Sequence, residues 1–217
     1  GSSVRATPPS LPPPITRFAH YDVLGRIAIG GMAEIYLGRE SVEGGALRQL
    51  ALKVLRRQND AGDGAYFEEL FLREGRTAAQ LVHPNICHIY SFGKWSGHLY
   101  IAMEWIDGVS LSQVLRTLAA SGRPLDPLIA VSIAAQVAGA LDYAHNVRDA
   151  RRQALAIVHR DVNPQNIMIR HDGMVKLLDF GVAQVDDKHT DSRGDTFKGK
   201  FGYMAPEQAR QGAIDGR

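Results

Sequence analysis

Three oxygen-bearing side chains stand close to short apolar runs in the second half of this 217-residue sequence. Asp161 and Asn166 lie five positions apart in "HRDVNPQN", and Asp179 ends the apolar run in "LLDFG". Together their carboxylate and amide oxygens could supply the ligands that a hard cation such as Mg²⁺ prefers. Asp179 taken alone also fits a strand end followed by a turn, so a cation site depends on all three residues meeting.

Two charged residues stand in apolar surroundings in the first half of the chain. Lys53 lies inside the strand-like run "LALKVL", and Glu74 falls on the apolar face of a predicted helix. A buried charge is costly unless it is paired, so a helix packed on a sheet would bring these two together. The alternative is that both side chains reach out to solvent. The apolar face of the helix is marked by Phe67, Leu70, Phe71, Ala78 and Leu81.

A glycine pair, Gly30-Gly31, lies between alternating apolar residues. Because no side chain blocks the approach, backbone N–H groups there can turn toward an anion. Taken alone, such a pair is more often only a hairpin.

The elements that must position these residues change character along the chain. Residues 21–106 are rich in strand patterns, with turns at Glu43–Gly45 and Ser96-Gly97. After "DGVS" the sequence becomes helical, Ser110 is a candidate N-cap, and residues 146–154 read as a solvated loop. We expect an α+β, two-lobed plan. The apolar stripe of the longest predicted helix comprises Ile129, Ile133, Val137, Leu141 and Ala144.

Composition narrows the classes of function. The formal net charge is only +2, with no block of like charge, so nucleic acid is not an expected partner. The single Cys87 favours a reducing, cytoplasmic location. The run "PLIAVSIAAQVAGALDYA" has polar interruptions and predicts a buried helix, so we expect no membrane segment. Residues 1–18 read as a tag remnant, "GSS", followed by a proline-rich flexible leader.

Six motifs occur in a fixed order: the glycine hairpin, Lys53, Glu74, H-R-D-x-x-x-x-N, D-F-G and A-P-E (Ala205–Glu207). In this order they resemble the protein kinases, in particular the bacterial eukaryotic-like serine/threonine kinases, from about Tyr21 to Arg217. The resemblance implies a two-lobed protein-kinase-like fold of the α+β class. Its small β-rich N-lobe would comprise residues 19–106 and its partial helical C-lobe residues 107–217.

The resemblance also implies a role for each motif. Lys53, positioned by Glu74, would hold the α- and β-phosphates of ATP, and Asp161 would orient the substrate hydroxyl and accept its proton. Asn166 and Asp179 would hold Mg²⁺. Ile35, Ala51 and Met168 would enclose adenine, Met103 would be the gatekeeper, and backbone groups of Glu104 and Ile106 would bind the adenine edge. The lid over the phosphates would comprise Ile27, Ala28, Ile29, Gly30, Gly31, Met32, Ala33, Glu34 and Ile35.

Arg160 beside Asp161 suggests an activation segment that phosphorylation can order. Thr196 is the first candidate acceptor, followed by Thr190 and Ser192. All three are equally consistent with solvated loop hydroxyls.

Three features depart from the family pattern. Ala28 and Ala33 replace the first and third lid glycines, from which we expect a stiffer lid. Asn163 stands where serine/threonine kinases usually have the lysine that neutralises the γ-phosphate. Lys200 stands at the usual threonine position before Y-x-A-P-E, so we hypothesise that it supplies the missing cation from the other side of the cleft. The alternative is that Lys200 points to water and the enzyme is slow or inactive.

The chain stops ten residues after Glu207, where the family continues with further C-lobe helices. We expect a fragment or a truncated product whose large lobe needs those helices, or a partner surface, to cover its apolar faces.

The predicted function is transfer of the γ-phosphate of ATP to serine or threonine of proteins, including autophosphorylation. Pro164 and "YMAPEQ" favour the serine/threonine branch over the tyrosine branch. The main alternative is an ATP-binding pseudokinase that acts as a scaffold or switch. A small-molecule phosphotransferase is a third possibility, which the intact activation segment and A-P-E disfavour.

Overall fold

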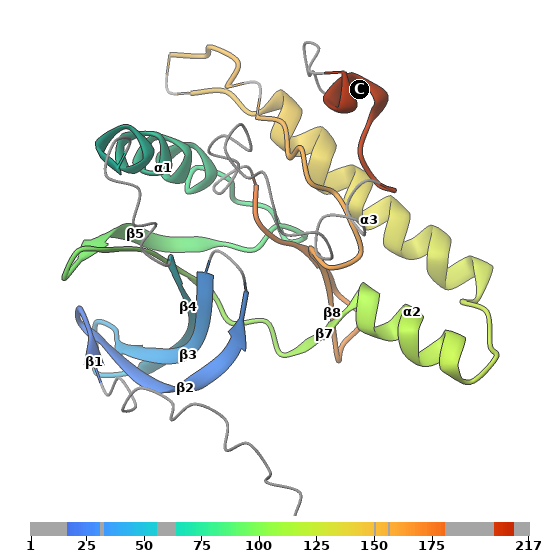
Figure 1. Ribbon diagram of the computed structural model, residues 1–217, viewed down its shortest axis with the longest axis horizontal. Helices are drawn as coiled ribbons and strands as arrows, with labels where there is room; N and C mark the ends of the chain where they lie inside the picture. The colour runs from blue at the N-terminus through green and yellow to red at the C-terminus, as the bar shows by residue number, and fades with distance from the viewer. Residues whose placement is uncertain are drawn as a thin grey trace, which may run out of the picture. The chain divides into compact units, whose positions relative to one another are not determined.

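The computed structural model describes residues 17–30, 33–55, 64–149, 151–155, 157–180 and 202–210. The chain forms two compact units (Figure 1). Unit 1 comprises residues 1–57 and 93–105, and unit 2 comprises residues 58–92 and 106–217. The lobe boundaries expected from the sequence, 19–106 and 107–217, stay a prediction, because compactness alone does not define a lobe.

Unit 1 is built on a curled sheet of antiparallel strands (Figure 1). The strand order is β1-β2-β3-β4-β6-β5, and β5 enters this sheet from unit 2. Sequential strands are neighbours in this order, except that β4 pairs with β6 and not with β5. The strands are β1 (Arg17–Phe18), β2 (Tyr21–Ile29), β3 (Ala33–Ser41), β4 (Leu47–Leu55), β5 (Ile89–Trp95) and β6 (His98–Glu104).

The core of unit 1 lies on one face of β3 and β4. Leu50 and Leu52 are fully buried there. Gly38 on β3 leaves the space that these two leucine side chains occupy, because a Cβ at this position would lie 3.1 Å from a methyl carbon of each leucine. Aromatic rings close the far end, where Phe18 lies 4.7 Å from Trp95 and 5.4 Å from Tyr100 between ring centroids.

Unit 2 carries the helices. Side-chain caps begin two of them: Ser110 Oγ accepts from the Gln113 N–H, and the Asp126 carboxylate accepts from the N–H groups of Leu128 and Ile129. The Ser110 cap predicted from the sequence is thereby confirmed. The helices are α1 (Gly64–Ala78), α2 (Leu111–Ala120), α3 (Pro127–Asn146) and the short α5 (Pro206–Ala209).

A small sheet of order β7-β8-β9 adjoins the helices of unit 2. Its antiparallel strands are β7 (Gly108–Ser110), β8 (Ile167–Arg170) and β9 (Val175–Leu177). On the outer side of β9, Leu177 forms a parallel bridge with Ile86. The Leu177 N–H donates to the Asn85 carbonyl at 2.8 Å, and the Leu177 carbonyl accepts from the Cys87 N–H at 2.9 Å.

The buried face of α3 differs from the predicted stripe. Ile133, Val137 and Ala144 are buried as expected, but Ala140 is also buried and Ile129 is 53% exposed. The helix is apolar on nearly all sides, so periodicity alone does not fix which face packs. In the segment 146–154, which the sequence predicts to be a solvated loop, Arg148 and residues 151–154 are exposed, and the Asp149 carboxylate accepts from the N–H groups of Arg151 and Gln153.

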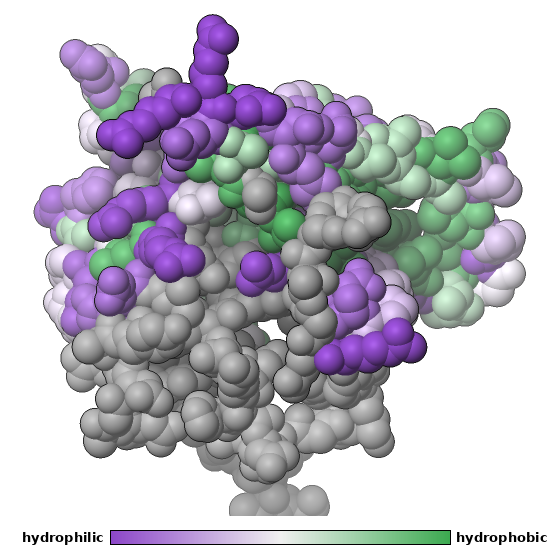
Figure 2. All heavy atoms as spheres, turned by 90° about the horizontal axis from the view of Figure 1, so that it is seen from above, coloured by the Kyte–Doolittle hydropathy of each residue, from purple (hydrophilic) through white to green (hydrophobic). Residues whose placement is uncertain are grey.

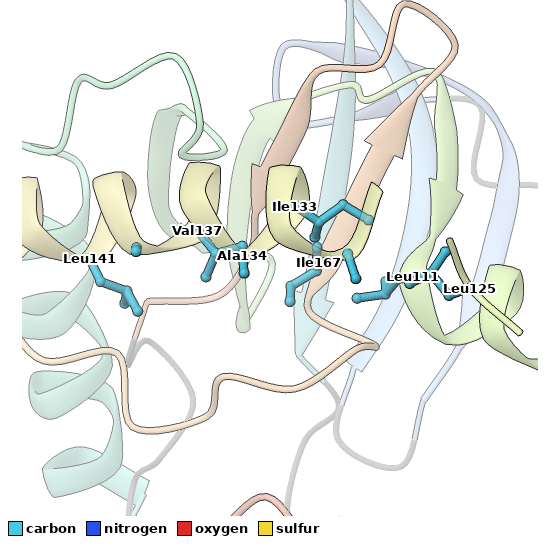
Figure 3. A pocket seen from close by; sticks show the side chains of 9 residues that line it. Leu111, Leu125, Ile133, Ala134, Val137, Leu141 and Ile167 are labelled. Atoms are coloured by element: carbon cyan, nitrogen blue, oxygen red, sulfur yellow. The ribbon is translucent and has the colours of Figure 1, made fainter. Parts of the chain in front are cut away.

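Several apolar side chains of unit 2 remain at its surface. Leu128, Ile129 and Val131 of α3 are exposed, and Figure 2 shows hydrophobic residues gathered where α2 and the start of α3 lie. A pocket of about 400 Å³ lies between α2, α3 and β8, lined by apolar residues such as Leu111, Ile133 and Ile167 (Figure 3). The expectation that further helices or a partner cover these faces stays a prediction.

Within the described ranges, α3 alone is long and apolar enough to cross a membrane by length and composition. Its polar Gln136 binds two groups of unit 2: its side-chain oxygen accepts from Asn85 Nδ2 at 2.9 Å and from the Val175 N–H at 3.0 Å. Both hydrogen bonds are partly buried, and they hold α3 against the segments that contain Asn85 and Val175.

Candidate active site

Asp161 is the centre of a compact hydrogen-bond network in unit 2. Asn166 Nδ2 donates to the Asp161 carbonyl at 2.8 Å and to its Oδ2 at 3.0 Å. Asn163 Nδ2 donates to the same carbonyl at 3.1 Å and to Oδ1 at 2.9 Å. Both carboxylate oxygens therefore accept a hydrogen bond from a neutral amide, which fixes the direction of the carboxylate.

The contact between Asn163 and Asp161 is one that sequence reasoning missed. From the sequence, Asn163 is notable only because it replaces the usual lysine. In the structure it is 5% exposed, and its side-chain amide donates to Asp161. A signal was present: an asparagine before proline often accepts from a backbone N–H two residues ahead. Here Asn163 Oδ1 accepts from the Gln165 N–H at 2.8 Å.

His159 is a buried residue that contacts the backbone of the loop around Asp161. Its ring is 1% exposed and packs on Phe180, with ring centroids 4.6 Å apart. Nδ1 accepts from the Asp161 N–H at 3.2 Å, so the ring hydrogen sits on Nε2, which donates to the Leu178 carbonyl at 2.6 Å. Burial lowers the pKa of His159 below its ordinary value, and the nearby Leu178 carbonyl, Asp179 and Asp161 offset this only in part.

Backbone geometry joins the predicted metal ligands. The Leu178 N–H donates to the Asn166 carbonyl at 2.8 Å, which places the residue before Asp179 next to Asn166. Arg160 and Asp179 both adopt positive φ angles, 64° and 55°. Residues other than glycine rarely do so, and such strain is typical of active sites.

The side-chain chemistry at this point fits Mg²⁺. Because Asn166 directs its amide nitrogen at Asp161, its amide oxygen faces away, and it accepts no hydrogen bond within the described residues. Mg²⁺ is usually bound by one or two protein oxygens together with substrate phosphates and waters, not by a full protein cage. In the described part of the chain there is no cluster of three or more His, Cys, Asp or Glu side chains that could hold a metal.

Gln208 joins α5 to the loop around Asp161, a second contact that the sequence did not indicate. Its Nε2 donates to the Arg160 carbonyl at 2.7 Å, and its Oε1 accepts from the Ala205 N–H at 3.1 Å. The segment that follows A-P-E is thus tied to the loop that precedes Asp161.

Four of the predicted nucleotide-binding residues share one face of the unit 1 sheet. Ile35 lies opposite Lys53, and Ala51 lies opposite Met103. Since opposite residues and alternate residues of a strand point to the same side, all four side chains lie on the face away from Leu50 and Leu52. Lys53, Ala51 and Met103 are buried, and Ile35 is partly buried.

The predicted lid is a β-hairpin as far as it is described. Ala28 pairs with Ile35, Ile29 pairs with Glu34, and the Gly30 N–H donates to the Ala33 carbonyl at 2.8 Å. On the face opposite Lys53, Glu34 Oε2 accepts from the Tyr36 hydroxyl at 2.7 Å and pairs with Arg26 Nη1 at 3.2 Å. Burial, followed by the hydrogen bond to Glu34, raises the pKa of Tyr36.

The remaining predicted residues are placed as follows. Ile27 is exposed, Glu104 pairs with Leu50 on β4, Ile106 is buried in unit 2, and Met168 pairs with Ser110 and Lys176 in the small sheet. Glu74 lies in α1, but its side chain is outside the described part of the structure. The predicted residues that lie outside the described ranges are Gly31, Met32, Thr190, Ser192, Thr196 and Lys200.

Comparison with known proteins identifies the family and the fold of this chain. A family model described as the protein kinase domain matches residues 21–216. The chain belongs to the protein kinase family. It has the protein kinase fold, and the kinase domain of PknI from Mycobacterium tuberculosis aligns with it at a TM-score of 0.67 and 33% identity, covering 95% of this chain and 71% of that one.

Two curated relatives carry different names for their specificity. The tyrosine-protein kinase MasK of Myxococcus xanthus is 36% identical over 217 residues, which is 100% of this kinase chain and 33% of MasK. The serine/threonine-protein kinase PrkC of Bacillus subtilis is 36% identical over 192 residues, covering 88% of this chain and 27% of PrkC. The chain thus spans 33% of the length of MasK and 27% of the length of PrkC.

Proposed function

We propose that this chain is an ATP- and Mg²⁺-dependent protein kinase that phosphorylates serine or threonine, including residues of its own. The observation that carries the proposal is the Asp161 carboxylate, held at both oxygens beside the Asn166 amide. A fixed carboxylate within reach of a substrate hydroxyl is what a protein kinase needs at its catalytic loop.

In the proposed reaction, the substrate hydroxyl oxygen forms a bond to the γ-phosphorus, and the bond from that phosphorus to the β–γ bridging oxygen breaks. ADP leaves with that oxygen, and the hydroxyl proton passes to the Asp161 carboxylate. Because a carboxylate can accept more than two hydrogen bonds, the two amides can hold Asp161 while it receives this proton.

Asn166 and Asp179 would hold Mg²⁺, which when bound neutralises charge on the phosphate oxygens. Lys53 of unit 1 would hold the α- and β-phosphates, and Glu74 of unit 2 would position Lys53. The shared sheet face of Ile35, Ala51 and Met103 would contact adenine, with Met168, Glu104 and Ile106 completing the pocket. These assignments rest on the family pattern and on the positions of the residues within each unit.

Serine/threonine specificity is the finer part of the proposal. Pro164 in the catalytic loop and "YMAPEQ" support it, as does the name of PrkC, whereas the name of MasK supports tyrosine. Phosphoamino-acid analysis of the autophosphorylated chain distinguishes the two: phosphoserine or phosphothreonine supports the proposal, and phosphotyrosine alone contradicts it. Thr196, then Thr190 and Ser192, are the proposed acceptors.

The alternative is an ATP-binding pseudokinase, which the absence of a lysine at position 163 favours. Incubation of the chain with labelled ATP and MgCl₂, beside the Asp161→Asn variant, separates the two functions. We expect label on the protein that disappears in Asp161→Asn. Nucleotide binding without transfer would instead identify a pseudokinase.

Lys200 is proposed to supply the cation that Asn163 lacks. Lys200→Met should then lower autophosphorylation, while nucleotide binding is kept. Unchanged autophosphorylation in this variant would reject the exchange.

A further inference from the structure

We propose that Asn163 is a positioning residue for Asp161, a role that rests on the proposed kinase function. In this role its amide does not stand in for a phosphate-binding lysine. It fixes the carboxylate that receives the substrate proton while the hydroxyl oxygen bonds to the γ-phosphorus and ADP departs.

The direction of the Asn163 amide follows from its partners. The Gln165 N–H can only donate, so the group that faces it at 2.8 Å must be the amide oxygen. The amide nitrogen then faces Asp161, whose carbonyl and Oδ1 can only accept. The reversed amide would place donor against donor and acceptor against acceptor at every one of these contacts.

The same contacts exclude a direct role at the phosphate. An amide nitrogen carries two hydrogens, and Asn163 directs both at Asp161. The side chain is also 5% exposed, so it is not presented to a ligand. Asn163 therefore acts through Asp161.

Asn163 and Asn166 form a matched pair around Asp161. Each donates once to the Asp161 carbonyl and once to a different carboxylate oxygen. Removal of the Asn163 amide takes away the hydrogen bond at Oδ1, one of the two amide contacts that set the direction of the carboxylate. A displacement of about 1 Å at a reacting group can cost on the order of 100-fold in rate.

Three substitutions separate positioning from a purely structural role. Asn163→Asp keeps an oxygen for the Gln165 N–H but sets a carboxylate against Asp161, so repulsion between like charges replaces the contact with Asp161. Asn163→Ala loses both contacts. Asn163→Ser provides a hydroxyl that can accept from Gln165 and donate to Asp161, and it should restore part of the activity.

The readout is kcat and KM for ATP with the full chain, MgCl₂ and myelin basic protein. We expect Asn163→Asp to lower kcat by about 100-fold with little change in the KM for ATP. The expected order of kcat is wild type, Ser, Ala, Asp. If Asn163 served only to bind the Gln165 N–H, Asn163→Asp would keep that contact and would be more active than Asn163→Ala. A kcat of Asn163→Asp above that of Asn163→Ala therefore overturns the proposal.

A matched control is available on α3. Asn146 Nδ2 donates to the Asp142 carbonyl and to its Oδ1, both at 2.9 Å, which repeats the donor pattern of Asn163 at a site away from the loop. Asn146→Asp should leave kcat unchanged. If the wild type shows no phosphoryl transfer that depends on Asp161, the kinase function itself is rejected. If the wild type transfers phosphate and Asn163→Asp has the same kcat, only the positioning role is rejected.

A second measurement does not depend on activity or on the folding of Asn163→Asp. In protein labelled with ¹⁵N-asparagine, the side-chain amide signals of Asn163 are assigned by their loss in Asn163→Ser. We expect these signals to shift in Asp161→Asn and to stay in place in Asp142→Asn. Signals that do not respond to Asp161→Asn would show that the contact is absent, and would overturn the proposal.

Discussion

His159 is held as a neutral ring by two backbone groups. The Asp161 N–H donates to Nδ1, and Nε2 donates to the Leu178 carbonyl. A second ring proton on Nδ1 would face the Asp161 N–H, so protonation would break the contact that supports the catalytic loop. This agrees with the lowered pKa of His159, whose main cause is burial.

This lowered pKa makes stability depend on pH. The unfolded chain binds a proton at His159 below its ordinary pKa of 6.5, and the folded chain does so only at lower pH. The contribution of His159 to the free energy of unfolding is therefore complete above pH 6.5 and is lost as the pH falls through the folded pKa. Urea titrations from pH 7.5 downward should show this loss.

The non-titrating variant His159→Gln should be less stable at neutral pH but should lose less stability on acidification. His171→Gln is the control, because its side chain is 75% exposed. An equal pH slope in wild type and His159→Gln would show that another group is responsible.

Gln208 should matter for the protein substrate. Gln208→Ala removes the hydrogen bond to the Arg160 carbonyl, a contact worth about 1 kcal/mol, so we expect the KM for a protein substrate to rise by about fivefold. The KM for ATP should change less. Gln80→Ala, which removes a similar bond to the Arg76 carbonyl, is the control, and an equal effect in both variants would contradict this assignment.

At the scale of elements, the pairing of β7 with β8 leaves no room at Gly108. A Cβ there would overlap the Ile169 carbonyl oxygen and lie 2.8 Å from the Arg170 Cα. Gly108→Ala should lower the free energy of unfolding by at least about 1–3 kcal/mol, measured by urea titration, because backbone atoms must move.

Gly139→Ala on α3 is the opposite case. A Cβ there meets nothing within 4 Å, and alanine is the better helix former. It should raise the free energy of unfolding by about 0.5–1 kcal/mol. A destabilisation equal to that of Gly108→Ala would show that space at β7 is not the cause.

The lid strands β2 and β3 are joined by Arg26, Glu34 and Tyr36. Because the pKa of Tyr36 is raised, its hydroxyl stays protonated and donates to Glu34 throughout the physiological range. Tyr36→Phe should speed hydrogen exchange of backbone amides near Glu34 by about tenfold, as the loss of one hydrogen bond of about 1.4 kcal/mol implies. The control is Arg39→Ala, which breaks an exposed ion pair with Asp22 and should leave this exchange rate unchanged. An equal increase in both variants would contradict a specific role of Tyr36.

Short-range features of the fold could be predicted from the sequence. The Ser110 cap depends on residues within one helical turn, and the lid hairpin depends on a local alternating pattern. The contact between Gln208 and Arg160 joins residues 48 positions apart, and no local pattern carries it. Asn163 is intermediate: its turn with Gln165 is local, but its contact with Asp161 depends on how the whole loop folds back.

At the scale of the molecule, the chain exposes apolar surface on unit 2. Leu128 is 81% exposed and Val131 66% exposed, whereas Ile133 of the same helix is 7% exposed. Leu128→Gln with Val131→Gln should therefore lower binding of an apolar dye such as ANS without lowering the melting temperature. Ile133→Gln should reduce stability by about 2–5 kcal/mol. A similar loss of stability in the double variant would mean that this surface is covered.

The bonds around Leu177 also bear on how copies of this protein behave in a crowded solution. An open strand border can template the addition of a foreign strand, which is a common start of aggregation. Here the segment 85–87 already occupies the outer rim of β9, through the Ile86 bridge and the bonds of Leu177 to Asn85 and Cys87. The small sheet is therefore sealed on that side against intermolecular β-extension.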